Sequence, residues 1–292
     1  MTPAQKKILH TMHERGEATR PQLAAATGLS EVTVGKAVAA LCRSGQLRQA
    51  GEISSGGGRP VQLYHYNTTH AWHAAIAISR EETLLRVHVQ LLDLHGNAKK
   101  SVEGRFTYLE AESLDGLLET LLRGRHLLSI TLPASSISLP DELVPHLRQR
   151  FRCEIHTPSA AALLAQESEP GTATLCLSAG QYPSCAIAHP HGIRECGPLH
   201  LLPIPGDWTA LEASDRNHAV EMVASLLVII TCTLAPQRIR VYAPAWSSRL
   251  TERIRYNAAT KLKGHLPPLH FAQASPADMQ QATLTWCSAW RD

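Results

Sequence analysis

Two basic and two hydroxyl side chains near the N-terminus have the types and spacing needed to contact DNA. Lys36 and Arg43 lie on one face of a predicted helix that begins after Ser30 and includes Thr33. Three small residues share that face: Val32, Gly35 and Ala39. A helix that presents small and basic residues fits the major groove. We therefore predict that Lys36 and Arg43 contact bases or phosphates. Ser30 and Thr33, where the helix starts, are expected to contact phosphate or base edges.

A glycine run followed by an arginine forms a second candidate contact. Three glycines at positions 56–58 separate a predicted strand that starts at Leu47 from a returning strand between Arg59 and Tyr64. Consecutive glycines let the backbone approach a phosphate or a minor groove, because they carry no side chain that would clash. The guanidinium of Arg59 suits a phosphate or a narrow groove. We predict that this hairpin is a wing and that Arg59 is its DNA contact.

Local signals place the first group of residues on a helix-turn-helix. Thr19 followed by Gln22 is typical of a capping box, so a first helix begins there, and Gly28 ends it. Ser30 caps the second helix. That helix has apolar residues at the spacing of one buried stripe: Val34, Ala37, Val38 and Leu41. The pattern predicts a winged helix-turn-helix whose second helix is the recognition helix.

The positive charge is concentrated in this N-terminal module. Residues 1–66 hold eight Lys and Arg residues against four acidic ones, a net charge of +4. The whole chain carries +3, so the remaining residues carry −1. A basic module on a near-neutral body is typical of a nucleic-acid-binding protein with a separate second function. We predict double-stranded DNA as the partner.

Length and composition indicate the class of the remaining chain. Beyond the first 66 residues, 226 of the 292 remain, enough for one large or two medium domains. An apolar fraction of 44% and a charged fraction of 18% are typical of a soluble globular protein. The longest apolar stretch, Met222 to Ala235, has about 14 residues and is expected to be a buried helix, not a membrane span. Lys6 and Lys7 interrupt any signal-peptide core, so we expect a cytoplasmic protein without a membrane partner.

Seven cysteines are scattered along the chain without a Cys-x-x-Cys pair. Their odd number and irregular spacing argue against a disulfide scaffold and favour a reducing cytoplasm. Cys185 and Cys196 flank His189 and His191, a set that can in principle bind zinc. Its irregular spacing, and Pro190 within it, favour an ordinary turn instead. We expect no metal and no other cofactor.

The body after residue 66 divides into two predicted lobes. Residues 67–168 begin with strands in a meander and continue as alternating helices and strands. Residues 169–292 begin with a hairpin and further extended structure, then continue with a long helix from Asn217 to Leu234, a strand and two more helices. The order of helices and strands in the two lobes implies an α/β body with mixed sheets flanked by helices. Two lobes of similar order suggest an actin-like or sugar-kinase-like (ribonuclease H-like) duplication.

Nearly the full length of the chain resembles the ROK family (repressors, open reading frames, kinases) in its repressor form. Leu29 to Lys36 is similar to the family's recognition helix, and Gly56 to Pro60 is similar to its wing and the entry into the body. Leu91 to Gly96 resembles the family's first hairpin, and Leu234 to Ile239 resembles the late helix-to-strand passage of its second lobe. The resemblance implies a winged helix-turn-helix followed by a two-lobed body.

Three segments depart from the family's catalytic pattern. Ser79 to Thr83 stands where the family has a glycine-rich phosphate loop, and its two glutamates would oppose a triphosphate. Thr-Pro-Ser at 157–159 stands where the kinases have an Asn-Asp pair that supplies the general base. The second phosphate loop, Ser178 to Ser184, keeps one glycine, and His200 lacks the family's zinc-binding cysteines. The resemblance therefore implies an inactive body without catalytic residues.

We therefore predict a sequence-specific DNA-binding transcriptional regulator, a repressor by resemblance. Its body is expected to serve dimerisation and the sensing of a sugar-related effector, and not to be an enzyme. Two modules in a homodimer or higher homo-oligomer would read a pseudo-palindrome with half-sites about one or two helical turns apart. Two alternatives stay open: a regulator controlled by a protein partner without a small ligand, and a sugar kinase with an accessory DNA domain.

Overall fold

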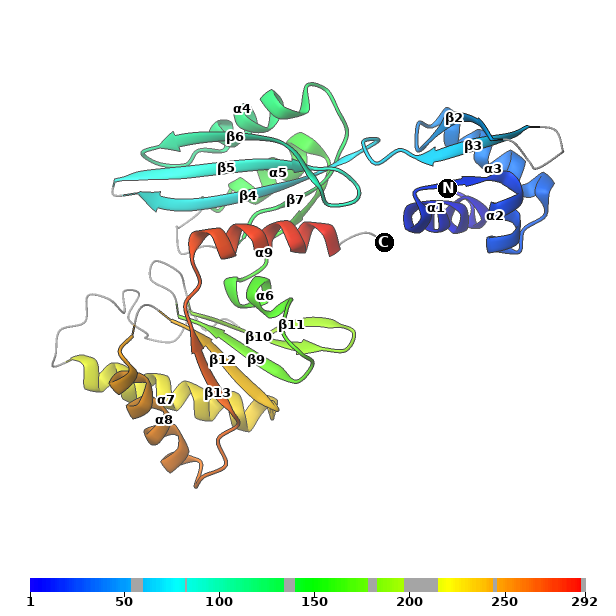
Figure 1. The fold of residues 1–292 in the computed structure, drawn as a ribbon. Helices are drawn as coiled ribbons and strands as arrows, with labels where there is room; N and C mark the ends of the chain where they lie inside the picture. The colour runs from blue at the N-terminus through cyan, green and yellow to red at the C-terminus, as the bar shows by residue number, and fades with distance from the viewer. Residues whose placement is uncertain are drawn as a thin grey trace. The chain divides into compact units, whose positions relative to one another are not determined.

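The computed structural model describes residues 1–53, 60–81, 83–133, 140–177, 183–196, 215–243 and 246–289. The chain forms two compact units, whose elements are labelled in Figure 1. The first unit holds Met1–Trp72 together with Asp93–Asn97, and the second holds His73–Leu92 and Ala98–Asp292. The domain boundaries expected after residues 66 and 168 stay predictions.

The first unit consists of three helices and a small antiparallel sheet. Its elements are α1 (Pro3–Arg15), β1 (Glu17–Thr19), α2 (Arg20–Thr27), α3 (Glu31–Arg43), β2 (Leu47–Ile53) and β3 (Val61–Tyr66). The strands lie in the order β1-β3-β2, with β3 antiparallel to both neighbours. Apolar side chains from all three helices and the sheet form one core: Ile8, Met12, Leu23, Val34, Val38, Leu41, Leu47 and Tyr64. This shared core stabilises helices that are too short to be stable alone.

Side-chain caps determine where α2 begins and ends. The backbone N–H of Gln22 donates to Thr19 Oγ1 at 3.4 Å, and the N–H of Thr19 donates to Gln22 Oε1 at 2.8 Å. Gly28 follows the helix in the left-handed conformation, with φ 67° and ψ 16°, and its N–H donates to the carbonyl of Ala24. The predicted capping box and helix end are both confirmed.

A turn from farther along the chain completes the first unit. The carboxylate of Asp93 accepts a hydrogen bond from the backbone N–H of His95 at 2.9 Å. The imidazole of His95 stacks on the ring of Tyr66, with ring centres 5.5 Å apart, and meets His13 edge to face at 4.9 Å. The turn thus contributes a ring to a small aromatic cluster between α1 and β3.

The first sheet of the second unit has the strand order β6-β5-β4-β7-β8. The strands are β4 (Trp72–Glu81), β5 (Leu84–Leu92), β6 (Ala98–Phe106), β7 (Leu127–Thr131) and β8 (Glu154–His156). β4, β5 and β6 form an antiparallel meander, whereas β7 and β8 are parallel. Helix α4 (Ala111–Leu122) packs on β5 and β6, and α5 (Leu143–Phe151) packs on α4 and β8.

The second sheet has the strand order β11-β10-β9-β12-β13. The strands are β9 (Thr172–Cys176), β10 (Ser184–His189), β11 (Gly192–Cys196), β12 (Arg238–Tyr242) and β13 (Leu269–Ala272). β9, β10 and β11 are an antiparallel meander, and β12 runs parallel to β9 and β13. Helices α7 (Asp215–Leu234) and α8 (Ser248–Lys261) share one core with this sheet. Helices α6 (Ala160–Ala165) and α9 (Pro276–Ala289) share the other.

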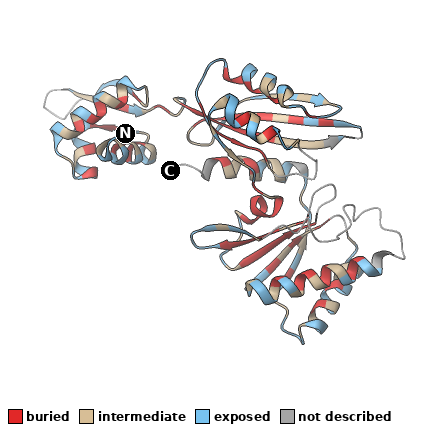
Figure 2. Cartoon of the chain, turned by 180° about the vertical axis from the view of Figure 1, so that it is seen from behind, coloured by how far each residue is buried: buried red, intermediate tan, exposed pale blue. Residues whose placement is uncertain are grey.

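The two sheets have the same topology. If the strands of each lobe are numbered along the chain, both sheets have the spatial order 3-2-1-4-5. All five residues of β9 and four of the six residues of β10 are buried, because helices cover both faces of the sheet (Figure 2). The expected α/β body with mixed sheets is confirmed, and so is the similar order of its two lobes.

Helix α7 explains the longest apolar stretch of the sequence. It has 20 residues, so it begins two residues before the expected Asn217 and ends at Leu234 as expected. Among the described residues it is the one helix long and apolar enough to cross a membrane by length and composition alone. Its residues Val220, Val223, Leu227 and Ile230 recur at three- and four-residue intervals and are buried against the second sheet. This packing accounts for the apolar character of that face.

The cap of α2 can be tested by unfolding experiments. Thr19→Ala removes the hydroxyl that accepts the Gln22 N–H and is expected to lower the free energy of unfolding by about 1 kcal/mol. Urea unfolding of the full chain measures the change. Thr19→Ser keeps the hydroxyl and is the control. If the two variants lost the same stability, the lost methyl group and not the cap would be responsible.

Candidate nucleic-acid interface

The segment between α2 and α3 is a tight turn that sets the start of α3. Ser30 has extended backbone angles, and its hydroxyl accepts the N–H of Thr33 at 3.2 Å. The two hydroxyl oxygens lie 2.9 Å apart, and Ser30 is exposed. The predicted cap by Ser30 is confirmed. The hydroxyl groups of Ser30 and Thr33 are thus held together at the N-terminus of α3, where the helix dipole favours negative charge.

Helix α3 has one buried side and one exposed side. Its buried residues are Val34, Ala37, Val38 and Leu41, as the sequence pattern predicts. Lys36, Ala39 and Arg43 are exposed, and the Val32 side chain is 68% exposed. The exposed side of α3 combines charge with small apolar contacts.

Arg20 joins this surface, although sequence reasoning did not include it among the contacts. Its guanidinium lies 5.5 Å from the ring centre of Tyr64, in a cation–π arrangement. A Cβ placed on Gly35 would lie 4.0 Å from Arg20 Nη1, so the guanidinium lies beside the middle of α3. Sequence reasoning missed Arg20 because its partner Tyr64 lies 44 positions along the chain. Arg20 therefore adds a third cation beside Lys36 and Arg43.

The β2–β3 hairpin is the second predicted contact region. The strands pair antiparallel as far as Ile53 and Val61, with a register irregularity between Gln49 and Gly51. Arg59 and the three glycines at 56–58 lie outside the described residues. Arg59 therefore stays a prediction, and so do the DNA contacts of Ser30, Thr33, Lys36 and Arg43.

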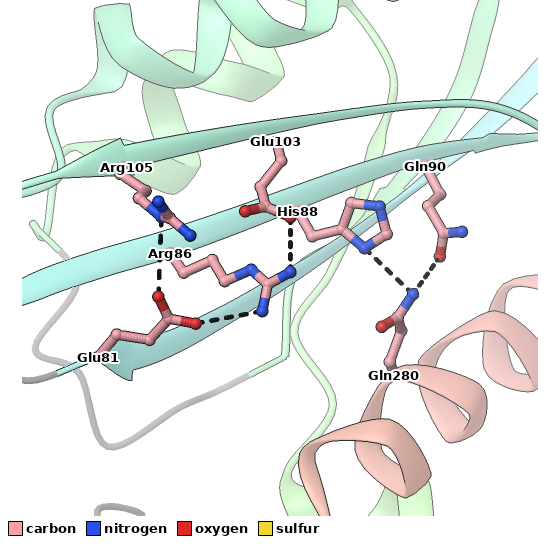
Figure 3. A network of polar contacts seen from close by, with 7 residues as sticks. All are labelled: Glu81, Arg86, His88, Gln90, Glu103, Arg105 and Gln280. Atoms are coloured by element: carbon pink, nitrogen blue, oxygen red, sulfur yellow. Dashed lines mark hydrogen bonds and ion pairs between the residues drawn. The ribbon is translucent and has the colours of Figure 1, made fainter.

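In the body, the β4–β5 hairpin stands where the resemblance places the first phosphate loop. The strands pair as far as Glu81 and Leu84, so only two residues separate them. The carboxylate of Glu81 lies 3.1 Å from Arg86 and 3.7 Å from Arg105 (Figure 3). Arg86 also donates to Glu103 at 2.7 Å, and this hydrogen bond lowers the pKa of the Glu103 carboxyl. The expected negative charge is thus offset at Glu81, while the second glutamate lies outside the described residues.

The tightness of this hairpin is the stronger argument against a phosphate loop. A phosphate cradle needs several successive backbone N–H groups that point at one anion. A two-residue connection between paired strands offers too few. In the second expected phosphate loop, residues 178–182 lie outside the described residues, and so does His200.

A carboxylate lies at the start of α6, although the expected catalytic position holds none. Ser159 caps this helix through the N–H of Ala162, and its own N–H donates to Glu195 Oε1 at 3.1 Å. Glu195 is exposed and comes from β11, 36 residues along the chain. Local sequence reasoning missed it for that reason. One carboxylate supplies one part of a phosphoryl-transfer site, which also needs bound phosphates and metal ions.

The Cys-His set around the β10–β11 turn is spread along the hairpin. His189 pairs with Gly192 at the turn, whereas Cys185 pairs with Cys196 at the other end of the strands. Across the described ranges, no three His, Cys, Asp or Glu side chains come together in a metal-binding arrangement. The ordinary turn that Pro190 and its neighbours predict is confirmed.

Solved structures of one family share the fold of this chain. A ROK family transcriptional regulator, a homologue of the E. coli MLC protein, matches 98% of this chain over 97% of its own length, with a TM-score of 0.50 and 11% identity. The chain has the fold of the ROK family. No protein-family model matches the sequence, and no curated protein does.

Two further structures with the ROK fold are similar to this chain. One is a ROK hexokinase from Thermus thermophilus, with 13% identity and a TM-score of 0.49. The match includes 73% of this chain and 97% of the hexokinase chain. A ROK family protein from Streptococcus pneumoniae TIGR4, in complex with sucrose, covers 74% with 98% of its own, at 13% identity and a TM-score of 0.45. A fold by itself does not assign an activity.

Proposed function

We propose that this chain is a sequence-specific DNA-binding transcriptional regulator, with α3 as the recognition helix of a winged helix-turn-helix. The observation that supports it is the exposed side of α3, where Lys36 and Arg43 lie beside the small residues Val32, Gly35 and Ala39. Neither cation forms an ion pair within the part of the chain that the structure describes. Both are therefore available for phosphates or guanine edges.

The helix start supplies the second part of the argument. The hydroxyl groups of Ser30 and Thr33 lie together at the positive end of α3. Recognition helices place their N-terminal residues against base edges, and the preceding helix crosses the backbone. Arg20, at the start of α2, is placed to contact a phosphate beside the same groove. Arg59 is the corresponding contact proposed for the wing.

The body is proposed to dimerise the module and to sense a sugar-related effector. Two modules in one dimer would raise both affinity and specificity, because the second one binds at a high effective concentration. The sign of regulation is proposed as repression, because the sequence resembles the repressor form of the ROK family. Since only two residues separate β4 from β5, and Thr157-Pro158-Ser159 offers no carboxylate where the resemblance places the general base, we propose no kinase activity for this body.

Charge removal on α3 tests the recognition helix. Lys36→Ala or Arg43→Ala is expected to weaken binding to a selected duplex by about 1 to 3 kcal/mol if the side chain reaches a base. If it reaches a phosphate, the salt slope should fall by about one unit. Fluorescence anisotropy at several salt concentrations measures both, with duplexes selected from a random pool by the full-length protein.

Arg249→Ala is the matched control for these variants. It removes one exposed positive charge from α8 in the second unit. Affinity and salt slope should stay at the wild-type values. Equal losses for Arg249→Ala and the α3 variants would show a general charge effect and would exclude α3 as the recognition helix.

Gly35→Ala separates stability from DNA binding. An added Cβ would meet only Arg20 Nη1, at 4.0 Å, so the structure accommodates it. Alanine in place of a mid-helix glycine should raise the free energy of unfolding by about 0.5 to 1 kcal/mol. The same methyl group should weaken specific DNA binding, because it stands on the groove-facing side. Greater stability with unchanged affinity would contradict the close approach of α3 to DNA.

Ligand addition tests the proposed role of the body. ATP with magnesium should leave the melting temperature unchanged and should not phosphorylate any sugar. A sugar, sugar phosphate or sugar acid that is the effector should stabilise the protein by about 2.7 kcal/mol at 100 times its Kd. Stabilisation by ATP would contradict the reading of the β4–β5 hairpin. A panel without any effect would favour control by a protein partner.

A further inference from the structure

Two cysteines face each other across the β10–β11 hairpin. In the antiparallel register of these strands, Cys185 lies directly opposite Cys196. Directly opposed residues in an antiparallel pair have Cα atoms about 4.5 or about 5.5 Å apart and side chains on the same face of the sheet. Disulfides span Cα separations of about 4.4 to 6.8 Å. Both separations lie within the range that a disulfide spans, so the backbone at Cys185 and Cys196 allows a disulfide between them.

The two side chains are in contact but differ in exposure. Cys185 is 1% exposed and belongs to the apolar core under α7, and Cys196 packs against that core from its edge. Both are free thiols, and each shifts the pKa of the other. β11 is the edge strand of the sheet, so Cys196 is half-buried and open to one side. The pair thus has one thiol that solvent reaches and one that it does not.

The electrostatic surroundings make the outer thiol the more acidic one. The hydrogen bond from Cys185 lowers the pKa of Cys196, and the guanidinium of Arg194 lowers it further, while burial and Glu195 act in the opposite direction. The same hydrogen bond and burial raise the pKa of Cys185. Because the thiolate is the nucleophile, Cys196 is the attacking group and Cys185 the resolving one.

We infer that Cys185 and Cys196 form a redox modification site, a dithiol that closes to an intramolecular disulfide by exchange with a low-molecular-weight disulfide. A transient disulfide in an intracellular protein usually has a redox-sensing or catalytic role, in contrast to the permanent disulfides of secreted domains. The site is separate from the proposed DNA contacts and does not depend on them.

The reaction proceeds in two exchange steps. The Cys196 thiolate attacks one sulfur of the small disulfide, so that a mixed disulfide forms and one small thiolate leaves with the electron pair of the broken S–S bond. The Cys185 thiol, which solvent does not reach, then attacks the Cys196 sulfur and gives its proton to the departing sulfur of the small disulfide. The protein disulfide forms and the second small thiol leaves. In total, two protein thiols are oxidised and one small disulfide is reduced to two thiols.

The peptide bond after Arg194 allows a direct test. Trypsin cleaves there, between the two cysteines, and yields peptides 153–194 and 195–216. The reduced full-length protein is incubated with excess glutathione disulfide, alkylated, digested without reductant and analysed by mass spectrometry. We expect the two peptides to be joined by a disulfide after oxidation and separate after treatment with dithiothreitol.

Variants identify the partners of the bond. Peptide 153–194 also holds Cys153 and Cys176, so Cys153→Ser and Cys176→Ser are the matched controls, and each should keep the cross-link. Cys185→Ala and Cys196→Ser should abolish it. In Cys185→Ala, the reaction should stop at Cys196 bound to glutathione, which shows that the outer thiol still reacts. Wild-type protein that also stops at this mixed disulfide, or that leaves both thiols unmodified, would overturn the inference.

Discussion

The burial of one stripe of α3 is the constraint on which the proposed DNA contact depends. An α-helix has about 3.6 residues per turn, so burying Val34, Ala37, Val38 and Leu41 determines which side chains point outward. Lys36 and Arg43 then face away from the core, and neither forms an ion pair with another described residue. Gly28 ends α2, and Ser30 caps the start of α3 two residues later. These caps fix the first residue of α3 and so determine which of its side chains are buried and which are exposed. The chemistry of the exposed side thus follows from the packing of the other side.

Local signals predicted this module well, and non-local contacts account for what was missed. The caps at Thr19 and Ser30 and the stripe of α3 depend on residues within a few positions of each other. Arg20 acquires its place from Tyr64, and Glu195 acquires its place from Ser159, in each case across dozens of residues. The four residues of β13 form a strand because they pair in parallel with β12. No local sequence pattern predicts this pairing. The start of α9 at Pro276 is a local signal, since Ser275 and Asp278 form a cap there.

The body keeps the architecture of its fold while the candidate chemistry changes at connections. Both sheets have the same strand order, and helices cover both faces of the second. The segments expected by resemblance to depart from the family's catalytic pattern include the β4–β5 connection and the start of α6. Sheets tolerate such changes because connections carry few of the core contacts that hold the strands together. The ion pairs of Arg86 also lie at this hairpin. Arg86 pairs with Glu81 and Glu103, and Arg105 pairs with Glu81, so positive and negative charges offset each other there (Figure 3).

The turn at Asp93–Asn97 has a consequence for how the protein can be divided. Its residues belong to the first unit, although β5 before it and β6 after it belong to the second. The backbone therefore passes between the units three times, and no single cut releases the first unit whole. A fragment that ends at residue 72 would lose the imidazole that covers Tyr66 and His13. The N-terminal module therefore cannot be separated as one continuous segment of the chain. Part of its structure, Asp93–Asn97, comes from the connection between β5 and β6 of the body.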